Sequence, residues 1–225
     1  MRRGQSAKRD AEPPKALVCD FDGTITNLDT GELVLDRLAD GDWRYHHEQY
    51  VRGAITFEEC LRRQFALMQP TTKASILALV DEYVKVRPGF EGLLASAELV
   101  AAPVAVASYG LDFCIRHVLG RVRNGREIRV YSPRATVGAN GVRLAFPRRR
   151  LKESTNLKDD VVGLYKQRGF RVIFVGDGAS DFPAVGRADE SFAIAGSELA
   201  KMCKEAKIQC SSITEFSPIA DALAR

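Results

Sequence analysis

The apolar run Ala16-Leu17-Val18-Cys19 leads directly into Asp20-Phe21-Asp22-Gly23-Thr24. A short apolar run bounded by turn residues predicts a buried strand, so both carboxylates lie where that strand ends. One carboxylate in such a place can attack, the other can move a proton, and both can face a hard cation. The simpler interpretation is a surface turn, because Asp-Gly is common in turns.

A second acidic loop favours a functional site over a turn. Gly176-Asp177-Gly178-Ala179-Ser180-Asp181 follows another apolar run, Val172-Ile173-Phe174-Val175. In parallel sheets, ligands bind beyond the carboxyl ends of the strands, which is where both loops fall. The sequence therefore predicts one site that is built from both acidic loops.

The order of apolar runs and helical patterns predicts an α/β fold. Strand-like runs at residues 16–19, 104–107, 172–175 and 191–194 are separated by helix-like stretches that include 90–100, 111–119 and 159–168. This alternation is typical of a doubly wound parallel sheet with helices on both faces.

Two stretches interrupt the alternation. Residues 31–86 contain no strand-like run, and Phe57, Leu61, Phe65 and Met68 are spaced for one face of a helix. Farther along, the sequence around Asn140-Gly141 predicts a β-hairpin. We therefore expect a flexible basic tail at residues 1–14, an α/β core at 15–30 and 87–225, and a small helical insert at 31–86.

Composition narrows the class of protein. A chain of 225 residues, 45% of them hydrophobic, fits one domain with a small inserted module. The net charge of +4 is too mild to indicate nucleic-acid binding. The five cysteines are scattered without metal-ligand spacing, which predicts reduced thiols and a cytoplasmic protein. We expect neither a signal peptide in residues 1–14 nor a membrane span.

The chain resembles the haloacid-dehalogenase-like (HAD) superfamily, whose members carry four loops in a fixed order. The first loop is residues 20–24, and the fourth is residues 176–181. The second is Ser108, which follows the run at 104–107, and the third is a lysine, best placed at Lys158 with Lys152 as its rival. The resemblance extends from Lys15 to the C-terminus. It implies a HAD-like core that holds a phosphate site, and a cap, formed by residues 31–86, that covers this site.

The resemblance also implies residue roles in a magnesium-dependent phosphatase. Asp20 would be the nucleophile that forms an aspartyl-phosphate, and Asp22 the acid and base. Lys158 would neutralise charge. The Mg²⁺ ligands would come from Asp20, Asp177, the carbonyl of Asp22 and, in the outer shell, Asp181. Phosphate would be held by Ser108, by the backbone N–H of Tyr109 or Gly110, and by Thr24.

Within the superfamily the chain is most similar to two groups of phosphatases, which act on phosphoserine or on 2-hydroxy-3-keto-5-methylthiopentenyl-1-phosphate. Asp29 and Gln64 stand where the phosphoserine enzymes hold the substrate with charged glutamate and arginine, and Arg63 fits the methionine-salvage group. Two departures from the family pattern are Tyr109, where glycine is common, and Arg148-Arg149-Arg150-Leu151-Lys152, where the salvage enzymes are cysteine-rich.

The expected partner is a small phosphorylated metabolite, and the number of subunits is open. Two other functions stay possible at this point. One is transfer of the phosphoryl group to a second metabolite, as in mutases on this fold. The other is a non-catalytic protein that binds nucleic acid or a partner through residues 148–152 and the basic tail. The intact acidic loops argue against the latter, because clustered carboxylates that serve no function would repel one another without benefit.

Overall fold

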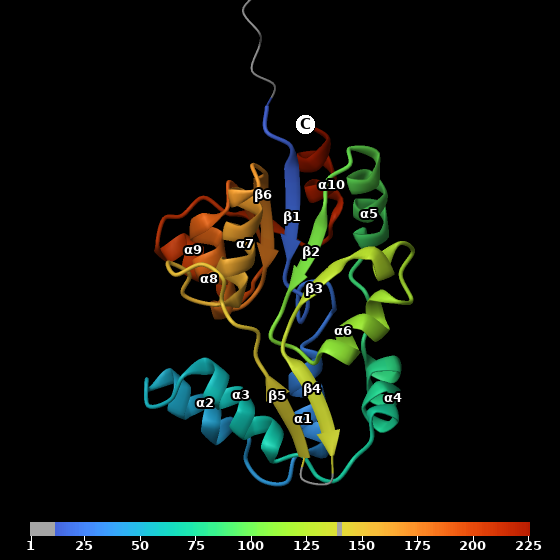
Figure 1. Cartoon of the computed structure of the whole chain (residues 1–225), viewed down its shortest axis with the longest axis vertical. Coiled ribbons are helices and arrows are strands. Elements are labelled where there is room, and N and C mark those ends of the chain that lie inside the picture. Colours follow the sequence, from blue (N-terminus) through green and yellow to red (C-terminus); the bar gives the residue numbers. More distant parts are fainter. Residues whose placement is uncertain (1–11, 139–140) are drawn as a thin grey trace, which may run out of the picture.

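The computed structural model describes residues 12–138 and 141–225, so residues 1–11 of the predicted tail and residues 139–140 of the predicted hairpin lie outside it. A six-stranded parallel sheet forms the centre of the molecule, with the strand order β3-β2-β1-β6-β7-β8 (Figure 1). Its strands are β1 (Lys15–Cys19), β2 (Val104–Ala107), β3 (Arg129–Tyr131), β6 (Arg171–Gly176), β7 (Glu190–Ile194) and β8 (Ser211–Ile213).

Alternate side chains of the central strand β1 enter two separate cores. Leu17 and Cys19 pack with one hydrophobic cluster, while Ala16 and Val18 pack with the other. The first cluster includes side chains of α5 (Phe90–Leu99), α6 (Asp112–Leu119) and α10 (Ser217–Ala224). The second includes those of α7 (Leu157–Gln167), α8 (Phe182–Arg187) and α9 (Glu198–Glu205). Because successive strand residues point to opposite faces, the sheet is covered on both sides, and the predicted doubly wound fold is confirmed.

The insert is helical, as the sequence predicts. It contains α1 (Thr30–Leu38), α2 (Arg44–Val51), α3 (Phe57–Ala66) and α4 (Lys73–Tyr83). Asp29, Thr56 and Thr72 each cap one of these helices with a side-chain oxygen. We call these four helices the cap; in Figure 1 they lie at the end of the molecule opposite the C-terminus.

The predicted hairpin forms from β4 (Arg134–Gly138) and β5 (Gly141–Ala145) and packs on the cap. Gly141 has a φ of +87°, and a Cβ at this position would lie 3.0–3.1 Å from backbone oxygens at the end of α3. Only glycine permits so close an approach. The hairpin therefore accompanies the cap in space, although the predicted boundaries leave it in the range of the core.

Two crossings join the core to the cap, and they run side by side. Thr26 on the outgoing segment and Val86 on the returning segment form an isolated antiparallel bridge. The Asn27 N–H donates to the Lys85 carbonyl at 3.0 Å, and the Lys85 N–H donates to the Asn27 side chain at 2.8 Å.

Within the described residues, no helix is long and apolar enough to span a bilayer.

Candidate active site

Lys158 lies between carboxylates from the two acidic loops. Its Nζ is 2.8 Å from Asp20 Oδ1 and 2.7 Å from Asp181 Oδ1, and all three side chains are at most 5% exposed. Asp20 follows β1 and Asp181 belongs to the loop after β6, which is the neighbouring strand. Parallel pairing of β1 with β6 thus brings together two carboxylates that are far apart in the sequence.

A third carboxylate completes an acidic group at this sheet edge. Asp20, Asp177 and Asp181 each offer an oxygen, and these oxygens all lie within 4.8 Å of one another. The backbone N–H groups of Asp177 and Gly178 donate to Asp181 Oδ2 at 3.1 and 3.0 Å and fix that carboxylate. Clustered carboxylate oxygens of this kind can hold a hard divalent cation.

The first loop approaches the fourth loop closely at Gly23. This residue has a φ of +72°, and a Cβ there would lie 2.3 Å from an Asp177 oxygen. Glycine is required on both counts. The hydroxyl of the adjacent Thr24, which is fully buried, donates to Asp177 Oδ1 at 2.9 Å and lies 3.4 Å from Asp20 Oδ2. Thr24 therefore holds the carboxylates in place in this structure.

Asp22 is held on the opposite side of the loop. Its Oδ1 accepts from the N–H and the hydroxyl of Thr30 at 2.9 and 2.5 Å. Its Oδ2 accepts from the Ser108 hydroxyl at 3.3 Å. The Gly110 N–H donates to Ser108 Oγ at 2.9 Å, and a Cβ on Gly110 would lie 2.3 Å from Asp22 Oδ2. The structure thus brings the predicted second loop, residues 108–110, against Asp22.

Burial dominates the titration of these groups. Loss of solvation raises the pKa of Asp20 to about 7, against the lowering effect of Lys158, and that of Asp181 to about 6. Burial, followed by the charge of Asp29, raises the pKa of Asp22 well above its ordinary value. Burial lowers the pKa of Lys158, but Asp181 and Asp20 outweigh it, and the net shift is upward. Lys158 is therefore a fixed cation.

Lys158 occupies the second position of α7, and three contacts fix the start of this helix. Asn156 caps it by accepting from the Asp159 N–H at 2.9 Å, and its side-chain amide donates to the Ser180 carbonyl at 2.8 Å. The hydroxyl of Tyr109 accepts from the Leu157 N–H at 3.0 Å. The rival third-loop residue, Lys152, is exposed. The structure therefore brings Lys158 to the acidic group.

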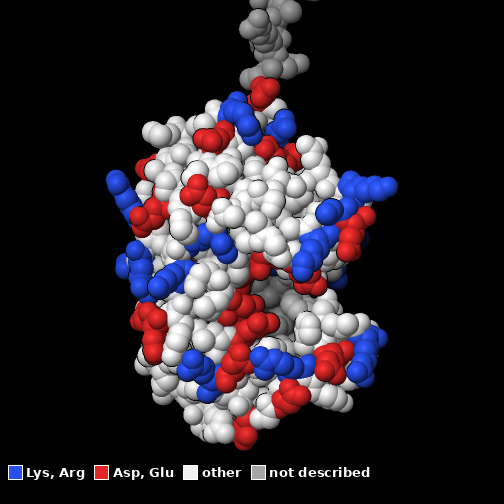
Figure 2. All heavy atoms as spheres, turned by 180° about the vertical axis from the view of Figure 1, so that it is seen from behind, with Lys and Arg blue, Asp and Glu red and all other residues white. Residues whose placement is uncertain are grey.

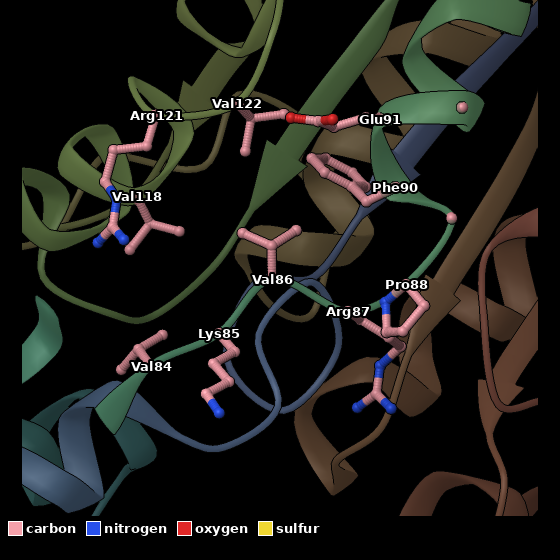
Figure 3. Close-up of a pocket in the computed structure, with 12 residues that line it drawn as sticks. Val84, Lys85, Val86, Arg87, Pro88, Phe90, Glu91, Val118, Arg121 and Val122 are labelled. Atoms are coloured by element: carbon pink, nitrogen blue, oxygen red, sulfur yellow. The ribbon is translucent and has the colours of Figure 1, made fainter. Parts of the chain in front are cut away.

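Sequence reasoning missed Arg87, which lies on the returning crossing beside a cavity of about 470 Å³ (Figure 3). Its guanidinium donates to the carbonyls of Gly23 and Thr24 at 2.7 and 2.8 Å, with a longer contact of 3.4 Å to the carbonyl of Thr26. Arg87 thereby braces the first loop. The only sequence signal is an arginine just before Pro88-Gly89, where the chain re-enters the core.

Thr30 and Asn156 were also missed, although both carry a recognisable signal. Thr30 is the first residue of α1 and follows the N-cap Asp29, while Asn156 is the N-cap of α7. Polar residues at helix starts are readily predicted as caps. Their second contacts, to Asp22 and to the carbonyl of Ser180, depend on tertiary placement.

Asp29, Arg63 and Gln64, which the sequence singles out in or beside the cap, lie in different surroundings. The Asp29 carboxylate accepts from the Glu32 N–H at 2.8 Å and is near enough to Asp22 to affect its pKa. Arg63 is paired with Glu59 at 2.7 Å and is about half exposed. The Gln64 amide is buried and lies 3.4 Å from the Trp43 carbonyl. Gln64 thus belongs to the interior of the cap.

Acidic side chains gather at a hollow on the face of the molecule that Figure 2 shows. Figure 2 shows a deep hollow between the core and the cap, with acidic side chains gathered along its edge. A hollow lined by carboxylates suits a positively charged ligand, such as a divalent cation, more than a bare anion.

A buried lysine between carboxylates at the strand ends of a doubly wound sheet suits a hydrolase or transferase of the α/β class. The family model of haloacid dehalogenase-like hydrolases matches residues 17–185. The chain therefore belongs to the haloacid dehalogenase-like hydrolase family, and the predicted recognition is confirmed.

The curated relatives of the chain are phosphatases, and solved phosphatase structures share its fold. It is 25% identical over 191 residues to a 2-hydroxy-3-keto-5-methylthiopentenyl-1-phosphate phosphatase of Bacillus pumilus, covering 83% of this chain and 81% of that protein. The same named enzyme of Geobacillus kaustophilus is 25% identical, with 93% and 95% covered. A phosphoserine phosphatase structure with a phospho-aspartyl intermediate analogue matches with a TM-score of 0.71 at 20% identity, covering 94% and 100%.

Proposed function

We propose that the protein is a magnesium-dependent phosphomonoesterase that acts on a small phosphorylated metabolite through an aspartyl-phosphate. The observation that supports this most is the contact of Lys158 with Asp20, inside a group of carboxylates that can hold a cation. A fixed cation beside a nucleophilic carboxylate offsets the repulsion between the nucleophile and the phosphoryl group. We include a cytoplasmic location in the proposal, since all five cysteines are free.

Asp20 and Asp22 divide the chemistry between them. An Asp20 oxygen bonds to phosphorus while the bond from phosphorus to the ester oxygen breaks, and Asp22 gives its proton to that oxygen. The raised pKa of Asp22 favours the protonated form that this step needs. In the second step Asp22 takes a proton from water, the water oxygen bonds to phosphorus, and the Asp20–phosphorus bond breaks. Inorganic phosphate leaves.

Other residues bind rather than react. Ser108, the backbone N–H groups of Tyr109 and Gly110, and Thr24 are proposed to bind phosphate, after exchanging some contacts that they make in this structure. The carboxylates of Asp20 and Asp177 and the carbonyl of Asp22 would hold Mg²⁺, with Asp181 in the outer shell. A bound Mg²⁺ would supply positive charge to the phosphoryl oxygens.

The decisive test replaces Asp20 by Asn, which keeps the shape and removes the nucleophile. Hydrolysis of p-nitrophenyl phosphate should fall by more than about 10³-fold. The control is Asp40→Asn, on an exposed part of the cap, which should retain wild-type turnover. Circular dichroism should show the same fold in all three proteins. Near-wild-type turnover of Asp20→Asn would refute the mechanism.

Metal dependence is tested separately. EDTA should abolish turnover and added Mg²⁺ should restore it, whereas Ca²⁺ should substitute poorly because it prefers more ligands and a looser geometry. Full activity in EDTA would remove the metal from the proposal while leaving the role of Asp20 to its own test.

For the substrate, we propose an ester with an uncharged tail of the methylthiopentenyl phosphate kind, with phosphoserine as the alternative that the structural neighbours favour. Gln64, at the position of the family's carboxylate-binding arginine, is engaged inside the cap. A missing charged partner costs roughly ten- to a hundredfold in affinity. Phosphoserine should therefore be the poorer substrate by kcat/KM, and efficient phosphoserine hydrolysis would reverse this assignment.

The cap residues Asp29 and Arg63 are proposed to contact the leaving group once the cap closes over it. Arg63→Ala should lower kcat/KM for the methylthiopentenyl ester by about tenfold more than for p-nitrophenyl phosphate, because only the former has groups for the cap to hold. Equal losses on both substrates would assign Arg63 a structural role.

A further inference from the structure

A cavity of about 390 Å³ lies where the cap meets the core, and its charge is strongly positive. The cap contributes Glu58 and Arg62 from α3, and the segment after β5 contributes Arg148, Arg149 and Lys152. Four cations therefore share the lining with one carboxylate. We call this place the basic cavity.

The cations of the basic cavity are only partly engaged. Arg62 stacks on the Phe146 ring at 4.6 Å and lies 3.6 Å from Glu58, which is a loose ion pair. Arg149 donates to the Ser154 carbonyl. Among the described residues, Arg148 and Lys152 have no side-chain partner. Like charges that converge in a small space repel one another, and a bound anion would relieve that repulsion.

The loop that carries three of these cations is firmly held. The N–H groups of Arg150 and Leu151 donate to the carboxylate of Asp160 at 2.8–3.1 Å. The Thr155 N–H donates to Asp159 Oδ2 at 2.8 Å. Both acceptors are buried in the first turn of α7. Segment 148–152 is thus anchored by the helix that carries Lys158, and its cations are presented by a supported backbone.

One aromatic ring separates the basic cavity from the active site. Tyr109 packs edge-on against Phe57 of α3 at 4.9 Å and lies 6.2 Å from Phe146, which lines the cavity. Its hydroxyl contacts the Leu157 N–H, next to Lys158. A ligand in the cavity therefore touches both the cap and the core directly beside the phosphate site.

We propose that the basic cavity binds a phosphate group of a small polyanionic molecule and so links the cap to the core. Arginine side chains from two elements match the several oxygens of a phosphate. The phosphate has two possible sources: a separate effector, which agrees with the uncharged-tail substrate proposed above, or a distal phosphate on the substrate, which would replace that substrate by a bisphosphate. Binding does not depend on the proposed function, but the distinction between the two sources rests on it.

The binding test uses pyrophosphate in EDTA and isothermal titration calorimetry. Arg148→Gln should weaken binding about tenfold, and Arg62→Gln by a similar factor. Arg44→Gln, which changes a cap arginine paired with Asp36 outside the cavity, should bind as the wild type does. Ser108→Ala should also bind normally if the probe occupies the basic cavity. Equal affinities in wild type, Arg148→Gln and Arg62→Gln would overturn the proposal, as would weakened binding in Ser108→Ala alone.

Arg148→Gln is the more secure variant, because its exposed side chain supports no contact in the fold and any loss reports on binding. Two kinetic arms then identify the source. If the wild type prefers a hexose bisphosphate over the monophosphate and Arg148→Gln loses this preference, the basic cavity binds the distal phosphate of the substrate. If pyrophosphate changes the turnover of p-nitrophenyl phosphate without competing with it, and the same variant loses this change, the basic cavity binds a separate effector. Wild-type protein that hydrolyses no ester would refute the proposed function and leave the calorimetric result standing.

Discussion

The active site and the basic cavity are opposite in charge and in burial. Around Lys158, three carboxylates surround one ammonium group, and the side chains of Lys158, Asp20 and Asp181 are at most 5% exposed. Four cations and one carboxylate line the basic cavity, and the side chains of Arg62 and Glu58 are each more than 40% exposed. The two places are separated by the ring of Tyr109.

This difference assigns the chemistry to the buried acidic group and the recognition of ligands to the exposed basic cavity. Buried groups with several fixed partners hold one geometry, and charge effects are strong where water is excluded. Exposed cations on long side chains adapt to a ligand and are screened by salt. Substitutions at the acidic group should therefore change turnover on every ester, while those in the basic cavity should act only on ligands that reach it.

The largest expected effect is at Lys158. Lys158→Met leaves the carboxylates without their cation, so kcat/KM for p-nitrophenyl phosphate should fall by more than about 10²-fold. Lys166→Met removes an exposed, ion-paired lysine from the same helix and should keep full activity. A loss of this size in Lys152→Met, with Lys158→Met active, would return the third-loop role to Lys152 and break the comparison.

The acidic group should also give the metal-free protein a distinctive pH dependence. The folded chain holds protons on Asp20 and Asp181, at pKa values of about 7 and 6, more tightly than the unfolded chain does at 3.8. Stability should therefore fall as pH rises from about 4 to about 7. The raised pKa of Lys158 adds a stabilising contribution that is constant over this range.

Urea unfolding in EDTA at pH 5 and pH 8 measures this effect. The midpoint should be lower at pH 8, and Asp20→Asn should reduce the difference because it removes one buried carboxyl group whose pKa burial raises. Asp40→Asn should retain the full difference. A midpoint that rises between pH 5 and pH 8 in the metal-free protein would contradict the prediction.

A smaller effect is expected at the ring between the two places. Tyr109→Phe keeps the aromatic contacts and removes the acceptor for the Leu157 N–H. Loss of this hydrogen bond should lower kcat roughly three- to tenfold, because the start of the helix that carries Lys158 is then less fixed. KM should change less than kcat. Tyr50→Phe removes a hydroxyl from the same aromatic cluster, and no described residue bonds it, so equal values for the two variants would refute this prediction.

Much of the acidic site was predictable because strand ends are visible in the sequence. Asp20 and Asp177 each follow an apolar run, and a parallel sheet places such ends together. The edge strands β3 and β8 were not predicted, since Arg129-Val130-Tyr131 and Ser211-Ser212-Ile213 lack an apolar run.

Contacts between distant segments left no local pattern. Arg87 reaches carbonyls more than sixty residues earlier in the chain, and the hairpin packs on α3 through the backbone at Gly141. Backbone carbonyls carry no sequence identity, so nothing in the order of residues indicates which arginine binds them. The predicted cap roles of Asp29 and Arg63 stay predictions, because they concern a bound substrate.

The paired crossings between core and cap have a consequence for protein engineering. The guanidinium of Arg87 donates to backbone carbonyls within residues 23–26. The bridge between Thr26 and Val86 joins the same two segments. A cap transplanted from a relative would replace one half of this joint and leave the other. Chimeras should therefore exchange residues beyond Asn27 and before Lys85, so that the joint stays native and the first acidic loop keeps its brace.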